Sequence, residues 1–159
     1  MHFKQRGGKV VKRPLPVERS RCLRLSLAVL CQDVEYDADG QLFSLNEPLH
    51  TVRKPSGESW PFTPATLMVY VQLEDAVGTY RFTAHVHTEQ GTVIEPVPAP
   101  TTITFAGHTN RSLPIEHIFS FPGLKFPSAG VYEFLVVCNH APLQLLGVVE
   151  AAARLRVID

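Results

Sequence analysis

Apolar and polar residues alternate along several short segments of the chain, and this period of two is typical of half-buried β-strands. The alternation begins at Cys22, where Leu25, Leu27 and Val29 fall on one side of an extended chain. Residues 67–73 (LMVYVQL) are the most apolar segment and predict a central strand. Weaker alternation predicts further strands over residues 41–45, 80–86, 92–95, 102–105, 115–121, 131–138 and 149–157.

Turn-forming residues separate these segments. Asp37-Ala38-Asp39-Gly40 and Glu89-Gln90-Gly91 predict tight reversals, because Asp and Gly tolerate left-handed backbone. The prolines between residues 48 and 64 predict a loop, and those between 96 and 100 block strand pairing. No segment shows a convincing amphipathic helix. Many short strands with turns between them predict an all-β fold, a single antiparallel β-sandwich of the immunoglobulin-like kind.

The strand faces also predict the residues of a single core. We expect the apolar side chains that share a face in each strong strand to be buried together. These residues are Leu25, Leu27, Val69, Val71, Phe82, Val86, Tyr132, Phe134, Leu155 and Val157.

Charge divides the chain into two parts, although the formal net charge is zero. Residues 1–24 hold eight basic residues against one acidic residue, for a charge of +7, and the remainder holds seven against fourteen, for −7. Residues 1–21 show no apolar period, so we expect a basic flexible tail followed by a β-sandwich domain over 22–159. Clustered cations attract phosphates. The candidates for binding nucleic acid or an anionic membrane are Lys4, Arg6, Lys9, Lys12, Arg13, Arg19 and Arg21.

His85 and His87 are the sharpest candidates for chemistry. Histidines at i and i+2 on a strand point to the same face, so both could reach one metal ion. Glu89 follows too closely to complete such a site, and both histidines lie opposite the face assigned to the core. We therefore expect solvent-facing histidines and no metal or cofactor, with a metal site at His85 and His87 kept as the weaker reading. The pair Cys138 and His140 lacks the second ligand pair that zinc sites need.

The three cysteines, Cys22, Cys31 and Cys138, form no CxxC pair and no disulfide-rich pattern. Reduced thiols in a cytoplasmic protein explain them best. The segment 22–31 is too short and too polar for a good export signal, and no run approaches a membrane span. No nucleophile motif or phosphate-binding loop is present.

Three pieces of the sequence carry a resemblance to a known family. They are residues 27–34 (LAVLCQDV) with 39–42 (DGQL), residues 60–62 (WPF), and the aromatic pattern between Phe119 and Phe134. On these the chain resembles a family of uncharacterised bacterial β-sandwich domains, known only as a domain of unknown function, over about residues 22–159. The resemblance implies an immunoglobulin-like sandwich and offers no catalytic residues.

These observations favour a non-enzymatic protein-interaction or scaffolding module, such as an accessory subunit of a bacterial enzyme system. Two alternatives stay open. One is a metal-dependent enzyme of the β-sandwich or double-stranded β-helix kind around His85 and His87, and the other is an anionic-polymer or membrane tether through the basic tail. A protein partner is expected, but its identity and the oligomeric state are left open.

Overall fold

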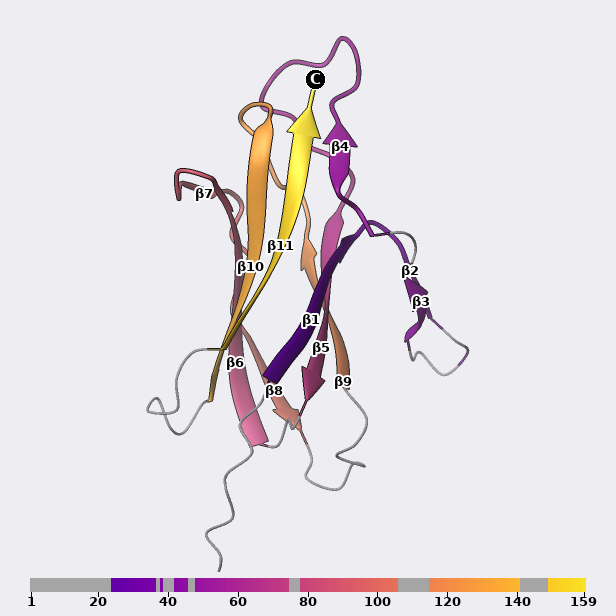
Figure 1. Ribbon diagram of the computed structural model, residues 1–159, viewed down its shortest axis with the longest axis vertical. Coiled ribbons are helices and arrows are strands. Elements are labelled where there is room, and N and C mark those ends of the chain that lie inside the picture. Colours follow the sequence, from indigo (N-terminus) through magenta and orange to yellow (C-terminus); the bar gives the residue numbers. More distant parts are fainter. Residues whose placement is uncertain are drawn as a thin grey trace, which may run out of the picture.

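A computed structural model describes residues 24–36, 38, 42–45, 48–74, 78–105, 115–140 and 149–159, apart from the side chains of 24–27, 42–45, 140 and 149–151. Within these ranges the regular structure is entirely β-strand (Figure 1). The strands are β1 (Arg24–Cys31), β2 (Val34–Tyr36), β3 (Leu42–Leu45), β4 (Thr51–Arg53), β5 (Leu67–Glu74), β6 (Gly78–Thr88), β7 (Val93–Ile94), β8 (Thr101–Phe105), β9 (Ile115–Phe121), β10 (Gly130–His140) and β11 (Val149–Ile158).

The strands form two principal sheets and one hairpin. The larger sheet has the order β4-β11-β10-β6-β7, with β8 also paired to β6. The smaller sheet has the order β1-β5-β9, and β2 pairs with β3 on its own. The two principal sheets run as separate layers along the long axis of the molecule (Figure 1). The all-β prediction is therefore confirmed for the described part of the chain.

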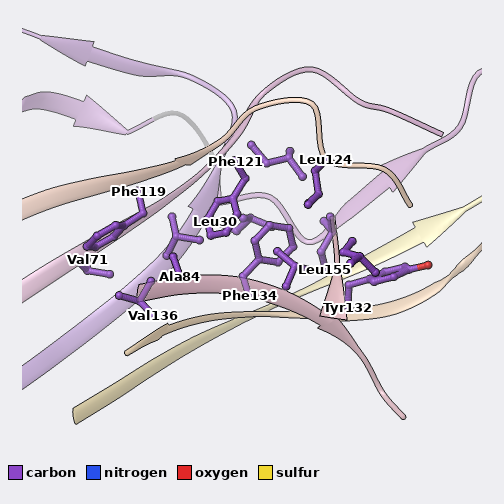
Figure 2. Close-up of a cluster of buried hydrophobic side chains, with 14 of the residues drawn as sticks. Leu30, Val71, Ala84, Phe119, Phe121, Leu124, Tyr132, Phe134, Val136 and Leu155 are labelled. Atoms are coloured by element: carbon purple, nitrogen blue, oxygen red, sulfur yellow. The ribbon is translucent and has the colours of Figure 1, made fainter. Parts of the chain in front are cut away.

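The core lies between the two sheets, because the inward-facing side chains of each sheet meet those of the other. Phe121 of β9 meets Phe134 of β10 edge-to-face, with ring centroids 5.2 Å apart, and Phe119 meets Phe82 at 5.4 Å. Figure 2 shows the rings of Phe121 and Phe134 among aliphatic side chains from both sheets. Eight residues of the predicted core are buried as expected, namely Val69, Val71, Phe82, Val86, Tyr132, Phe134, Leu155 and Val157.

The other two residues of the predicted core, Leu25 and Leu27, lie on β1, but their side chains are outside the described set. The predicted tail, residues 1–21, and the domain boundary that follows it lie wholly outside the described residues.

The predicted antiparallel pairing is wrong at one place. The segment 48–64, read from its prolines as a loop, contains β4, and β4 pairs in parallel with β11 at the register Val157↔Val52. The pairing forms because Val52 alone among its neighbours in β4 is buried, and its side chain joins the core beside Val157. A three-residue strand with one apolar position shows no alternation that a sequence pattern could detect.

The turn predicted at Glu89-Gln90-Gly91 is confirmed, whereas three of the four residues of the turn predicted at 37–40 lie outside the described residues. Gly91 has a φ of +84°, a left-handed conformation that closes the hairpin from β6 to β7 with little strain. The predicted return strand near residues 41–45 exists as β3, but it pairs with the short β2, while β1 pairs with β5. The long-range pairing places Leu30 beside Val69, so that both face the core.

Candidate functional site

The face of the larger sheet that points away from the core is built by the polar half of each strand. On β6, β10 and β11 the buried positions alternate with exposed or half-buried ones, and the second set shares the opposite face. We call this surface the outer face. Its described members on these strands are Thr79, Arg81, Thr83, His85, His87, Val131, Glu133, Leu135, Val137, Asn139, Ala152, Arg154, Arg156 and Ile158, with Val93 of β7, Thr102 and Thr104 of β8, and Thr51 and Arg53 of β4 beside them.

A row of charged side chains crosses the outer face. Glu133 of β10 lies opposite His87 on one side and Arg154 on the other. Its carboxylate oxygens lie 3.5 Å from Nε2 of His87 and 3.4 Å from Nε of Arg154. Val93 continues the row beyond His87, and nearly half of its side chain is exposed. Glu133 is thus paired with Arg154, whose side chain stays largely exposed.

His85 and His87 do share this face, as their spacing predicts, with ring centroids 5.8 Å apart. Both nitrogens of the His87 ring have partners: Nε2 faces the carboxylate of Glu133, and Nδ1 lies 3.2 Å from the carbonyl oxygen of Thr88. No group of three or more His, Cys, Asp or Glu side chains in the described ranges gathers closely enough to hold a metal ion. The geometry of the two histidines therefore fits surface residues in a polar row.

Half-buried aliphatic residues occupy the middle of the outer face. Val131, Leu135 and Val137 share the outward side of β10, the central strand, with Glu133 and Asn139. Because β6 and β11 pair with β10 on either side, these residues form an apolar strip between flanking polar side chains. The sequence pattern placed these residues opposite the core, but strand order was needed to place β10 in the middle.

The charge of the outer face differs from that of the domain around it. Residues 25–159 contain seven basic and fourteen acidic residues. Four of the basic residues, Arg53, Arg81, Arg154 and Arg156, point outward here and are exposed, against one described acidic side chain, Glu133. The side chain of Glu150, on the same strand, is outside the described set, and Glu89 sits in the hairpin turn at the rim. Among the described side chains, the outer face thus carries more basic than acidic residues, although the domain is acidic.

A second polar cluster involves the smaller sheet. Tyr70 of β5 is only 3% exposed, and its hydroxyl donates to Oε1 of Glu116 at 2.6 Å while accepting from Nε2 of Gln72 at 2.9 Å. Burial, followed by the hydrogen bond to the Glu116 carboxylate, raises the pKa of Tyr70 to about 12. The phenol therefore stays protonated and acts as a fixed donor that joins β5 to β9.

The thiols of Cys31 and Cys138 are free and buried. Burial raises the pKa of Cys138 to about 12, and burial together with the charge of Asp33 raises the pKa of Cys31. Both groups remain thiols at neutral pH, and a thiol is a weak nucleophile. Cys22, the third cysteine, lies outside the described residues, as do His108 and the side chain of His140.

His117 belongs to the inner face of the smaller sheet. Its ring stacks on Phe82 at 6.4 Å between centroids and meets Phe119 at 4.7 Å. Burial lowers the pKa of His117, because desolvation penalises the charged imidazolium. His117 therefore works as a half-buried aromatic residue packed against core rings.

This placement predicts an acid-sensitive stability. The unfolded chain gains a proton on His117 below about pH 6.5, whereas the folded protein resists it. The free energy of unfolding should therefore fall from about pH 7 to pH 5, and His117→Phe should flatten that dependence. Urea unfolding at both pH values measures it, with His50→Gln, at an exposed histidine, as the control. An unchanged pH dependence in His117→Phe would show that the imidazole titrates freely in the folded state.

The predicted polyanion-binding residues, from Lys4 to Arg21, all lie outside the described part of the chain, so the structure places none of them. No helix in the described ranges is long and apolar enough to cross a membrane.

Comparison with known proteins places the chain in one family. No curated protein matches it. A family model described as a family of unknown function (DUF6941) matches residues 26–147, which includes the smaller sheet apart from the first two residues of β1, and the larger sheet apart from β11. The resemblance seen in the sequence to an uncharacterised domain is thereby confirmed. The chain belongs to the DUF6941 family of unknown function.

Proposed function

We propose that the chain is a non-enzymatic protein-interaction module, an immunoglobulin-like β-sandwich that serves a bacterial enzyme system as a cytoplasmic accessory subunit. The outer face carries this proposal. Its apolar strip on β10 is flanked by polar side chains and arginines on the neighbouring strands. Protein interfaces commonly have this arrangement, with an apolar centre and a polar rim. The buried free thiols of Cys31 and Cys138 fit a reducing compartment.

Site-specific photo-crosslinking in the source cell tests the proposal. A photoreactive residue at Ala152, exposed on the outer face, should give a protein adduct. The matched control places it at Ser120 of β9, which is exposed on the smaller sheet. The crosslinked partner is identified by mass spectrometry and then bound in purified form. Adducts that form equally from both positions, or from neither, would contradict binding through the outer face.

The alternative is a metal-dependent enzyme around His85 and His87. The observation that favours it is the closeness of the two rings on one face of β6. Elemental analysis of the purified protein separates the two functions. Stoichiometric zinc or iron that disappears in His85→Ala would support the enzyme and contradict the interaction module. Metal content below a tenth of an equivalent, roughly the level of a contaminant, would support the module.

A further inference from the structure

The outer face also indicates the chemistry of its partner, an inference that rests on the proposed function. Four of the seven basic residues in 25–159 lie on this surface, although the domain as a whole is acidic. Glu133, the one described acid among them, is already paired with Arg154 at 3.4 Å, and His87 lies on its other side. A carboxylate approaching the face would therefore meet attraction there and repulsion from much of the remaining surface.

The positions of the arginines add a geometric preference. Arg154 and Arg156 are two residues apart on β11, so both point to the same side of the strand, beside the apolar residues of β10. Guanidinium groups bind carboxylates in a planar, two-bond arrangement. Val131 pairs directly with Arg156. Leu135 is the next outward residue of β10 after Glu133, which itself pairs with Arg154. A ligand that satisfies both features must carry carboxylates and apolar side chains together.

We propose that the outer face binds an acidic protein segment in which Asp or Glu side chains lie beside apolar ones. A nucleic acid satisfies the arginines alone, because phosphates and sugars leave the Val131, Leu135 and Val137 strip without an apolar partner. Four exposed arginines are also few for duplex DNA, whose affinity rises with each phosphate neutralised. An acidic segment from residues 25–159 of a second copy of the chain falls within this class of ligand, and the test separates it from a different protein.

Fluorescence anisotropy on the full-length protein tests the proposal with defined probes. The first is a labelled peptide of glutamate and leucine, and the second is the same peptide with lysine in place of glutamate. We expect the acidic peptide to bind and the lysine peptide to fail. Raising NaCl from about 50 to about 500 mM should weaken binding, because exposed charges are screened.

Two paired variants locate the binding within the chain. Arg154→Gln with Arg156→Gln should weaken the acidic peptide about tenfold, the loss of two charge-assisted contacts. Lys9→Gln with Lys12→Gln removes the same charge from the N-terminal segment and should change binding less than about twofold. If melting shows that the double arginine variant is unfolded, Arg156→Gln alone carries the test, with an expected loss of about threefold.

Several outcomes would overturn the acidic partner. One is that the arginine pair and the lysine pair of substitutions weaken binding of the acidic peptide equally, and another is that the lysine peptide binds. A third is that duplex DNA or phosphatidylglycerol vesicles bind more tightly than the acidic peptide, in a way that depends on the arginines. Concentration-dependent dimerisation that Arg154→Gln abolishes would identify a second copy as the acidic ligand and so support the proposal. If the acidic peptide fails while crosslinking from Ala152 still gives a partner, the charge class is wrong and the proposed function stands. If both fail, the outer face is not an interface.

Discussion

Phe134→Ala should lower the free energy of unfolding by about 3–5 kcal/mol, because removal of a fully enclosed ring loses its burial and leaves a cavity. Phe134 is 0% exposed and sits on β10 between β6 and β11. Its ring meets Phe121 from the opposite sheet edge-to-face at 5.2 Å (Figure 2). The side chain thus fills the contact between the two layers at the central strand of the larger sheet.

Urea unfolding of the purified variant measures this loss. Val97→Ala is the matched control, since Val97 is 53% exposed and its truncation should change stability by less than about 0.5 kcal/mol. A loss below about 1 kcal/mol for Phe134→Ala would mean that the two sheets do not close on this ring in solution.

Combining Phe134→Ala with Phe121→Ala tests the contact itself. The double-mutant cycle should give a coupling energy of about 0.5–1.5 kcal/mol, the usual range for an edge-to-face aromatic pair. Additive effects would indicate that the rings stabilise their own sheets independently.

Much of the fold follows from alternation because each strand buries one side. Phe82 and Val86 on β6, and Tyr132 and Phe134 on β10, were assigned to the core from their period of two alone, and all four are buried. The same rule put His85 and His87 on the opposite face, where the structure has them. The physical reason is general, since a strand with one apolar side has only one face that gains free energy on burial.

Strand partners could not be derived in this way. Alternation does not say that Glu133 faces both His87 and Arg154, because that contact depends on the register of three strands. Nor does it show that β4 joins β11 in parallel, a pairing between segments far apart in the sequence. The outer face was therefore visible as separate polar positions, but its basic charge and its apolar strip emerge only when β6, β10 and β11 are placed side by side.

A buried lysine is the feature that the sequence pattern predicts least. Lys54 follows β4 and is only 8% exposed. Its ammonium donates to the carbonyl of Glu58 at 2.8 Å, pairs with Oδ1 of Asp159 at 3.0 Å and lies 5.5 Å from the centroid of the Trp60 ring. The backbone N–H of Lys54 also donates to the carbonyl of Ile158 on β11. Lysine is rarely buried unless its charge is paired, and here three groups share it.

These contacts tie the end of β11 to the loop that carries Trp60, so Lys54→Met should destabilise the protein by about 2–3 kcal/mol. Methionine keeps most of the apolar stem, so the loss reports on the ammonium, through a charge-assisted hydrogen bond and a cation–π contact. Lys125→Met is the control, because Lys125 is exposed and should change stability by less than about 0.5 kcal/mol. Asp159→Asn should cost less than Lys54→Met, since the Asp159 side chain is 74% exposed and its ion pair is solvated. Urea unfolding compares the three variants with wild type. If Lys54→Met lowers the free energy of unfolding no more than Lys125→Met does, water replaces the ammonium contacts. The loop is then held by Trp60 and by the backbone pairing of β4 with β11.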